Sequence, residues 1–533
     1  MHRALLIGAV VLLAACGGGG GGAASPAPAP PPPPPPQPAW IVDSFLPAAS
    51  FADQCTVPRG GVDPVTGAPY PDRQGSTLTE NLWLRSWTHE LYLWYHEIVD
   101  AAADPTLYSP PDYFARLKTS AKTPSGSDKD RFHFALPTAE WRAQSQSGIT
   151  AGYGAQFVVL SSTPPRQVVV AYPEPGSPAA AAGLRRGTEV LSVDGVDLVH
   201  ANDAAAVAAL NGGLWPGGTG ETHVLTVRDR SGVTTDVTLQ SAIVQATPVQ
   251  NAQAIATPIG LVGYLLFNDH IATAEEQLTD AIRQLELANV TDLVLDLRYN
   301  GGGYLVLASE LAYMIAGGAQ TAGRTFERLR FNDKHPATNP VTGAPLAPLP
   351  FQSTTVGLSS APAGEPLPTL DLPRVFVLTG SGTCSASESI INALRGIDVE
   401  VIQIGSATCG KPYGFYPADN CGTTYFSIQF AGENEKGFGD YGDGFAPIDA
   451  PGPHGERIPG CAAADDFSHD LGDPLERRLA AALAYRESGS CPAPSGLGAP
   501  NGMTKPGAAG LLDTPDGELH RSPWRENRIL WLP

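Results

Sequence analysis

The chain has 533 residues, enough for two to four domains that each bury a core of their own. Hydrophobic residues make up 42% of it, which is typical of a globular protein, whereas its 51 prolines and 59 glycines exceed average usage. The formal net charge of −20 argues against nucleic acid or an anionic lipid surface as a partner of the folded body.

Residues 1–15 predict export from the cytoplasm. A short basic start precedes an apolar run, and this run is too short to span a bilayer as a helix. It ends in Leu-Ala-Ala-Cys, which resembles the lipobox of bacterial lipoproteins, in which the cysteine (here Cys16) is lipidated and becomes the first mature residue. A plain secretory signal with a cysteine near its cleavage site is the alternative.

Residues 16–39 predict a tether. Six glycines at 17–22 form a flexible stretch, and the prolines at 30–36 form a stiff polyproline spacer. Such a segment would hold a globular body away from a membrane. No acidic residue follows Cys16, which by the sorting rules of bacterial lipoproteins favours the outer membrane. We therefore expect a cell-envelope protein, anchored through lipid on Cys16 and facing the periplasm or the surface.

The cysteines agree with an oxidising compartment. There are seven, so lipidation of Cys16 leaves an even six for disulfides, whose pairing the sequence alone leaves open. Cysteine and histidine pairs with metal-ligand spacing are absent from the sequence, so we predict no metal site.

Residues 40–146 predict a helical N-terminal domain. Thr77 and Glu80 fit a capping box at the start of a helix. Large apolar side chains then recur at helical spacing, and we expect this face to pack against the rest of the protein rather than bind a ligand. The face consists of Trp83, Trp87, Leu91, Trp94 and Ile98.

Residues 147–245 predict a small β domain. The string GSPAAAAGLRRGTEVLSVDG at 176–195 resembles PDZ domains, in which a peptide tail adds as a strand to a sheet edge and a glycine-rich loop holds its carboxylate. The matching loop is Gly152, Tyr153, Gly154 and Ala155, although an ordinary glycine turn is the alternative. The β-type runs lie at 156–160, 167–172, 189–193, 223–227 and 235–239.

Residues 246–460 change to an α/β alternation typical of a buried parallel sheet. In the section 461–533 we expect one helix at 474–485, followed by a Gly/Pro-rich tail for which we predict no structure. The expected strands of the alternation are 263–267, 292–297, 374–378 and 399–404, and the expected helices are 274–287, 304–315 and 387–394.

Three elements in this section are candidates for chemistry. Ser385 lies at a strand-to-helix turn, where a helix N-terminus offers N–H groups, but Ser385 and Glu388 also fit a simple helix cap. Residues 296–303 end in three glycines that let a backbone approach a substrate, although alone they are a loop. Lys411 lies in an aromatic stretch where an amine can lose its charge, although alone it reads as a surface lysine.

Together, DLRYNGGG, SGTCSASESIINAL and CGKPYG, following a PDZ domain, resemble the C-terminal processing (tail-specific) serine proteases over roughly residues 148–447. The resemblance implies that Ser385 is the nucleophile and Lys411 the base. It also implies an oxyanion hole built from the backbone N–H of Ala386 and that of Gly302 or Gly303. No metal or organic cofactor is implied.

The stretch after the lysine departs from that family. Many members carry a glutamine four residues after the lysine to orient it, and this chain has Phe415 there. Cys409 and Cys421 bound the loop around Lys411, and we expect them to form a disulfide that holds it in place. Cys384, beside the serine, is expected to be a small packing residue.

These observations predict an α/β multidomain protein with a helical N-terminal domain, a PDZ β-domain and a crotonase-like α/β protease core. The expected function is endoproteolysis near protein C-termini, with substrate tails captured by the PDZ domain. A catalytically silent, peptide-binding PDZ lipoprotein is the alternative, and the missing glutamine favours it mildly. An acyl-CoA enzyme of the crotonase class is disfavoured by the export signal and the PDZ domain.

Overall fold

The computed structural model describes residues 39–358, 360–492, 518–519 and 528–529. The predicted signal, Cys16 and the tether lie outside these residues, so they stay predictions. No helix in the described part of the chain is both long and apolar enough to cross a bilayer.

The N-terminal region is helical only in part, which corrects the prediction for 40–146. Its α-helices are α1 (Thr77–Leu91), α2 (Pro110–Phe114) and α3 (Thr138–Ser147), and short 3-10 helices, turns and short strands make up the rest. Because α1 ends at Leu91, Trp94 and Ile98 lie beyond it. The predicted packing role is nevertheless correct, because Trp83, Trp87 and Leu91 pack in one apolar cluster, and Trp94 and Ile98 pack in another.

The cap of α1 also differs from the predicted one. Ser76 is the N-cap, so the third helical residue is Thr79 rather than Glu80. Thr79 N donates to Ser76 Oγ at 3.2 Å, and Ser76 N donates to Thr79 Oγ1 at 2.8 Å. The Glu80 carboxylate instead accepts from Thr56 N at 2.6 Å.

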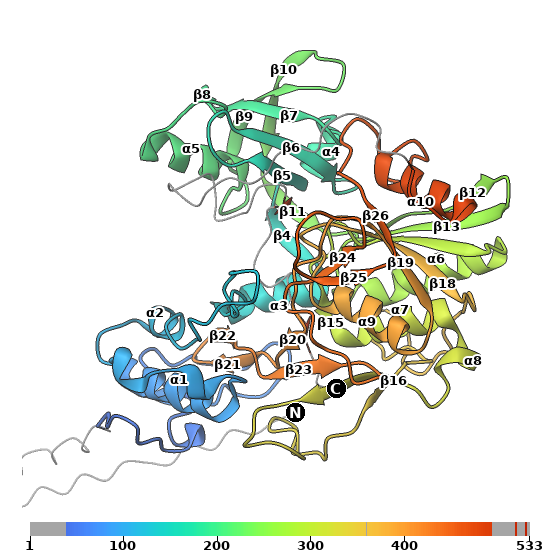
Figure 1. The fold of residues 1–533 in the computed structure, drawn as a ribbon. Helices are drawn as coiled ribbons and strands as arrows, with labels where there is room; N and C mark the ends of the chain where they lie inside the picture. The colour runs from blue at the N-terminus through green and yellow to red at the C-terminus, as the bar shows by residue number, and fades with distance from the viewer. Residues whose placement is uncertain (1–38, 359, 493–517, 520–527, 530–533) are drawn as a thin grey trace, which may run out of the picture. The chain divides into compact units, whose positions relative to one another are not determined.

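All five strands predicted for the PDZ region are present, in one sheet of order β10-β9-β7-β6-β5 (Figure 1). The short helix α4 (Pro178–Ala181) is capped by Ser177, and α5 (Ala204–Leu214) contributes Leu210 and Leu214 to the apolar core of the region. The strands are β5 (Ala155–Ser161), β6 (Gln167–Pro173), β7 (Glu189–Val193), β9 (Thr222–Arg228) and β10 (Thr234–Gln240).

The predicted α/β core is confirmed as a sheet of order β12-β13-β14-β18-β19-β26. Only β12 is antiparallel to its neighbour, and the other strands run parallel. The strands are β12 (Val249–Thr257), β13 (Gly260–Phe267), β14 (Asp292–Asp296), β18 (Arg374–Thr379), β19 (Glu400–Gly405) and β26 (Gly460–Ala462).

Both faces of this sheet are buried, as near-continuous apolar strands require. Side chains alternate, so Leu293 and Leu295 face α6 (Ala274–Leu287), α7 (Leu305–Ala316) and α9 (Ala386–Gly396). Val294 faces the opposite side, where α10 (Arg477–Ser488) packs together with apolar residues of β5 and β6. The PDZ region and the core thus share an apolar contact.

A second sheet, not predicted from the sequence, lies beside the helical layer. It has the order β17-β16-β23-β20, and β20 begins two residues after Lys411. The strands are β16 (Thr325–Arg330), β17 (Leu349–Pro350), β20 (Tyr413–Gly414) and β23 (Phe430–Glu433).

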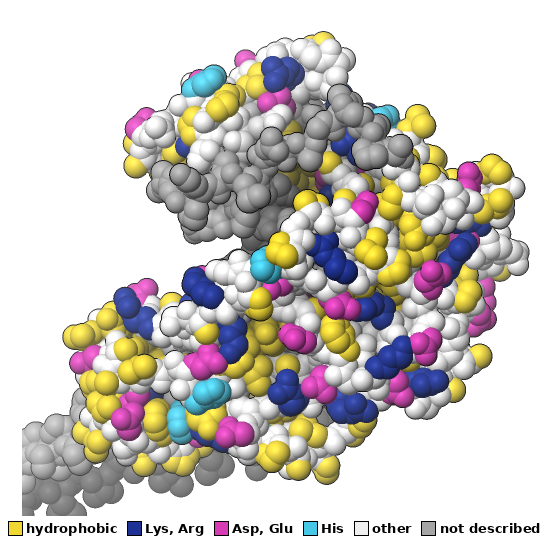
Figure 2. Space-filling model, in the orientation of Figure 1, with side chains coloured by type: hydrophobic (Ala, Val, Ile, Leu, Met, Phe, Trp, Pro, Cys, Tyr) yellow, Lys and Arg dark blue, Asp and Glu magenta, His cyan; other side chains and the backbone are white. Residues whose placement is uncertain are grey.

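On the face drawn in Figure 2, acidic and basic side chains are interspersed over the core.

The section after α10 contains two short strands where we predicted none. Strand β27 (Glu518–Leu519) pairs antiparallel with β5, and β28 (Arg528–Ile529) pairs parallel with β15 (Gly303–Tyr304). Neither has an apolar periodicity of its own, because each is only two residues long. The partner strands, rather than the local sequence, define them.

Candidate active site

The three segments singled out from the sequence meet at one edge of the core sheet. The neighbouring parallel strands β14, β18 and β19 lead at their carboxyl ends into the glycine loop, the Ser385 turn and the Lys411 loop, respectively. The carboxyl end of a parallel sheet is where open α/β folds place their ligands. Sequence order separates these loops by as much as a hundred residues, and strand order brings them together.

Backbone hydrogen bonds join the three loops. Cys384 N donates to Asn300 O at 3.0 Å, and the Ser387 hydroxyl donates to the same oxygen at 3.0 Å. Cys409 N donates to Thr383 O at 3.0 Å. The turn that carries Ser385 is therefore bonded to the glycine loop on one side and to the lysine loop on the other.

Ser385 is the N-cap of α9 and is completely buried. Its φ of 61° lies in the left-handed region, which a non-glycine residue adopts only when the surroundings impose it. Such outliers cluster at active sites, and a strained strand-to-helix turn is how serine hydrolases of the α/β type present their nucleophile. Ala386 is the first residue of α9, so its N–H lies at the positive end of the helix.

Glu388 connects the turn of Ser385 with the loop of Lys411. Its carboxylate accepts from Ser385 N, Lys411 N and Gly410 N, each at 2.8 Å, and from Thr408 Oγ1 at 2.6 Å. Burial raises the pKa of Glu388, while these four donors oppose that rise. The interaction goes beyond the helix cap that the sequence suggested, because one carboxylate fixes the backbone on both sides.

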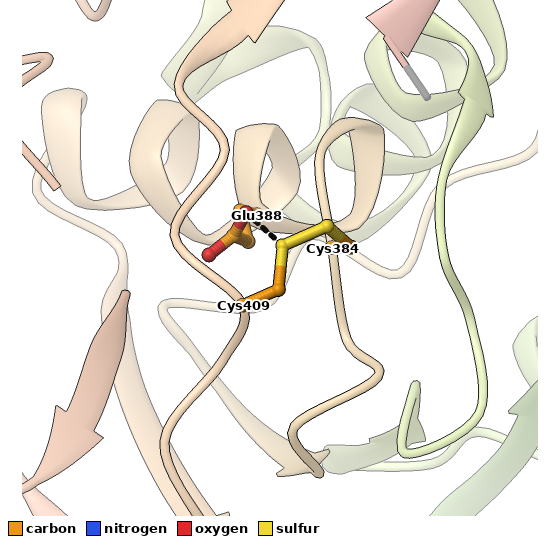
Figure 3. A group of neighbouring side chains, drawn as sticks. All are labelled: Cys384, Glu388 and Cys409. Carbon is orange, nitrogen blue, oxygen red and sulfur yellow. Dashed lines mark hydrogen bonds between the residues drawn. A yellow bond between two sulfur atoms is a disulfide. The ribbon is translucent and has the colours of Figure 1, made fainter. Parts of the chain in front are cut away.

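A disulfide fastens the same two segments (Figure 3). Cys384, the residue before Ser385, is bonded to Cys409, two residues before Lys411, with a Cα–Cα distance of 5.1 Å. Cys409 Sγ lies 3.4 Å from Glu388 Oε2, and a dashed line joins the two in Figure 3. A disulfide sulfur has no proton to donate, so this is a packing contact, and neither sulfur is a thiolate ligand for a metal.

The predicted Cys409–Cys421 disulfide is therefore wrong, and so is the packing role for Cys384. Cys421 lies in the turn between β21 (Ala418–Asn420) and β22 (Thr423–Phe426) and is bonded to Cys55 of the N-terminal region. The loop from Cys409 to Cys421 does not close on itself, because Tyr413–Gly414 within it pair with β23 of the second sheet. Six cysteines are paired, the third bond being Cys461–Cys491.

Lys411 is fully buried rather than at the surface. Its Nζ lies 4.5 Å from the ring centroid of Phe132 and 5.1 Å from that of Phe415. Phe415, at the position where the family resemblance predicts a glutamine, is itself fully buried and forms one wall of the lysine pocket. An apolar wall disfavours the charged ammonium and so favours the neutral amine, which is the form that a general base requires. The faces of the two aromatic rings act in the opposite sense, because they attract a cation.

The glycine loop is held by side chains that the sequence did not single out. Asn300 Oδ1 accepts from Gly302 N at 3.0 Å and lies 2.9 Å from His270 Nδ1. Burial lowers the pKa of His270 to about 3, so its ring is neutral at physiological pH. The Gly302 N–H is thus bonded within the loop, and Gly303 belongs to β15, which pairs with β28. A histidine followed 30 positions later by the loop asparagine gives no recognisable sequence pattern.

The predicted peptide-binding loop lies in the PDZ region and is separate from this cluster. Gly152, Tyr153, Gly154 and Ala155 line a pocket of about 210 Å³. The loop is fixed by Ala179 N donating to Tyr153 O at 2.9 Å and by Glu174 N donating to Gly154 O at 2.7 Å. The described residues that line this pocket include no lysine or arginine, and Glu174 is one of them.

Comparison with known proteins agrees with both regions. Residues 261–414 match the model of Peptidase family S41, and residues 143–213 match that of the PDZ domain. A carboxyl-terminal-processing protease of Picosynechococcus sp. is 29% identical over 218 residues, which are 39% of this chain and 49% of that protein. The corresponding protease of Synechocystis sp. is 25% identical over 265 residues, 50% of this chain and 54% of the relative.

The chain thus spans about half the length of the curated relatives that it matches. A solved structure from Bacteroides fragilis, assigned to the S41 proteases, covers 79% of this chain and 98% of its own with a TM-score of 0.58. At 23% identity this likeness shows the fold alone. The chain thus contains a region that matches Peptidase family S41, preceded by one that matches the PDZ domain, and it is similar to carboxyl-terminal-processing proteases.

Proposed function

We propose that this protein is a serine endopeptidase that cuts proteins near their C-termini, with Ser385 as nucleophile and Lys411 as general base. The observation that carries the proposal is the Glu388 carboxylate, which accepts from the backbone N–H of both residues at 2.8 Å. A binding protein has no need to hold a serine and a buried lysine in one fixed arrangement. Acyl transfer does need it, because a nucleophile is useful only beside its base.

In the proposed reaction, the neutral Lys411 amine takes the proton from the Ser385 hydroxyl as Oγ attacks the carbonyl carbon of the scissile bond. The backbone N–H of Ala386, together with that of Gly302 or Gly303, stabilises the oxyanion. The Lys411 ammonium then returns the proton to the leaving amine, which departs. Water attacks the acyl-enzyme by the same route, releasing the new carboxylate and regenerating Ser385.

The dyad is tested by two variants in the soluble protein from Trp40 onward. Ser385→Ala and Lys411→Met should each lower kcat for a tailed peptide by about 10³-fold or more, as for other nucleophile and base deletions. Lys411→Met preserves most of the side-chain volume, so the melting temperature should stay close to that of the parent. Activity of either variant equal to the parent would instead favour the catalytically silent, peptide-binding alternative.

We also propose that the body is lipid-anchored to the cell envelope through Cys16. The proposal rests on the lipobox-like sequence and on the glycine and proline tether that follows it. Labelling cells with a clickable palmitate should mark the parent protein and leave a Cys16→Ser variant unmarked. Equal labelling of both would remove the anchor and leave an ordinary secretory signal.

A further inference from the structure

Phe132, a residue of the N-terminal region, lies directly against the proposed base. The Nζ of Lys411 lies over its ring, 4.5 Å from the centroid, which is closer than the 5.1 Å to the ring of Phe415. Phe132 is buried, as are Lys411 and Phe415. An aromatic face attracts a cation, and the attraction is stronger where water is excluded. Phe132 precedes both of the regions that match known families, so a residue from outside them forms part of the lysine pocket.

The backbone beside Phe132 is fixed by hydrogen bonds. The buried Asp130 carboxylate accepts from Phe132 N at 3.0 Å and from the Tyr92 hydroxyl at 2.6 Å. The Arg131 guanidinium donates to the carbonyl oxygen of Cys409, the disulfide-bonded residue of the lysine loop. The first set of bonds holds the segment within the N-terminal region, and the second joins it to the lysine loop. The ring is therefore set against the lysine by its backbone as well as by packing.

The proposed reaction needs the lysine amine in both of its forms. It must be neutral to accept the proton of Ser385 and charged to return that proton to the leaving amine. An apolar pocket alone penalises the charged form. A glutamine near the lysine would offset this penalty by accepting a hydrogen bond, whereas a phenyl ring can do so only through its face. Two ring faces lie against Lys411 Nζ, and that of Phe132 is the nearer.

We propose that Phe132 is a positioning residue for Lys411, whose ring face holds the amine and stabilises the ammonium that forms when the Ser385 proton is transferred to it. Phe415 supplies a second, more distant ring face. This inference rests on the proposed peptidase function, because it assigns a role to the surroundings of the proposed base. It makes the N-terminal region a part of the catalytic machinery.

The test has to leave the other charged and titratable groups around this contact in place. Burial lowers the pKa of His133 to about 4 and raises that of Tyr413 to about 12, so both side chains are neutral at physiological pH. A change confined to the ring therefore isolates its effect on the lysine. The groups are Glu388 on α9, Tyr92 on the segment after α1, Asp130, Arg131 and His133 beside Phe132, and Tyr413 on β20.

A phenylalanine trifluorinated on its ring, placed at position 132, tests the proposal. Fluorine withdraws electrons from the ring face and weakens its attraction for a cation, while the shape of the side chain changes little. We expect the acid limb of kcat/KM for a tailed peptide to move to lower pH by about half to one unit, because a less stabilised ammonium loses its proton at lower pH. The plateau kcat should fall about three- to tenfold, since the weaker base accepts the Ser385 proton less readily.

The matched control is the same fluorinated residue at position 134. The Phe134 ring stacks on that of Phe426, with centroids 4.3 Å apart, and its fluorination should leave the acid limb in place. Natural side chains extend the series. Phe132→Leu removes the ring and should move the limb in the same direction, and Phe132→Tyr, which retains a ring face, should move it less. An acid limb that is the same in the parent and in the protein fluorinated at position 132 would overturn the inference.

A second measurement does not depend on catalysis. In a Ser385→Ala background with ¹³C-labelled lysine side chains, the NMR signal of Lys411, assigned by its loss in Lys411→Met, reports protonation of the amine directly. Its titration midpoint should fall when the ring at position 132 is fluorinated and stay in place when the ring at position 134 is. A shifted midpoint in a protein whose parent cuts no peptide would refute the proposed function and leave the contact between Phe132 and the lysine standing. An unchanged midpoint would overturn the inference whatever the kinetics show.

Discussion

The catalytic cluster and the PDZ peptide site are built in contrasting ways. In the cluster, a disulfide and one buried carboxylate with four donors join the Ser385 turn to the Lys411 loop, and hydrogen bonds to Asn300 O join that turn to the glycine loop. In the PDZ site, strand β5 and a glycine-rich loop offer mainly backbone groups beside a pocket lined by both polar and apolar residues.

The contrast follows from what each site has to do. Bond cleavage requires reacting groups to be placed within a fraction of an ångström, and such placement comes from locked surroundings. Capture of a tail through backbone hydrogen bonds tolerates many sequences, because every residue except proline offers the same N–H and C=O groups. Damage to the cluster should therefore appear mainly in kcat, and damage to the PDZ site mainly in KM.

Outside the dyad itself, the largest effect should come from Glu388→Gln. The amide presents an NH₂ group where one carboxylate oxygen accepted, so buried N–H groups of the Ser385 turn or the Lys411 loop lose their acceptor. A resulting shift of about 1 Å in either segment should lower kcat about a hundredfold, with KM nearly unchanged. Steady-state kinetics on a tailed peptide measure the effect.

Glu310→Gln is the matched control for Glu388→Gln. Burial, followed by the neighbouring Glu275, raises the pKa of Glu310 to about 9, so this carboxyl is already neutral at pH 7 and glutamine mimics it. It lies on α7, away from the dyad, and its variant should retain the parental kcat. A loss of similar size in both variants would show that Glu388 acts through general stability alone.

The next effect should come from the disulfide beside the dyad. Replacing Cys384 and Cys409 by alanine leaves the Glu388 interactions as the main link between the two segments, and we expect kcat to fall about thirtyfold. The matched control is Cys461→Ala/Cys491→Ala, which removes a disulfide of similar loop length outside the cluster. Both variants should lose stability, about 3 kcal/mol each by loop entropy. Only the first should lose kcat, and equal kcat values in the two would contradict this role.

The strands of this cluster were predictable from the sequence, and its cross-links were not. Apolar runs such as 292–297 and 374–378 leave little choice except buried strands, and the glycine, serine and lysine motifs follow them directly. The partner of Cys409 depends instead on strand order, since β18 and β19 are neighbours and bring Cys384 beside it. Proximity in the sequence points to Cys421 instead, because it is the next cysteine along the chain.

Two other features depend on long-range contacts in the same way. Strands β27 and β28 form only because β5 and β15 offer a backbone edge, so their own residues carry no signal. The role of Arg186 is likewise invisible in the string LRRG, where it stands beside an exposed arginine, Arg185. Only the fold distinguishes the two.

A smaller effect should come from Arg186→Met, which cuts the polar link between the two regions. Arg186, in the PDZ region, lies 2.6 Å from Asp465 and donates to the Tyr299 hydroxyl at 2.8 Å, one residue before Asn300 of the glycine loop. Burial opposes ionisation of Asp465, but Arg186, Arg478 and Arg298 outweigh it and hold its pKa well below the usual range. Losing one of these partners should lower kcat/KM about tenfold to twentyfold, because the loop backbone shifts.

The control for this link is Arg185→Met, which removes the same charge from an exposed neighbouring position and should leave kcat/KM unchanged. Acid unfolding gives an independent readout. A carboxylate with a depressed pKa stabilises the fold above its unfolded pKa and loses that contribution as pH falls through the folded pKa. Removing Arg186 raises the folded pKa of Asp465, so the acid midpoint should move to higher pH. An unchanged midpoint together with unchanged kinetics would mean that Arg186 does not couple the regions.

The smallest effect should be the preference for a free carboxylate at the substrate tail. A charge-assisted hydrogen bond from the loop of Gly152 and Gly154 would be worth about 1.5 kcal/mol or more, but Glu174 lines the same pocket and repels a second carboxylate. We therefore expect a free-acid peptide to be cut with a kcat/KM only about three- to tenfold above that of its amide, mostly through KM. Gly154→Ala is the matched loop variant, because the added Cβ would lie 2.3 Å from Ser177 Cβ at a φ of 73° and the loop must shift. This variant should cut both peptides equally. If the parent also cuts them equally, the loop does not read the terminal charge, and the PDZ site recognises tails through the strand edge of β5 alone.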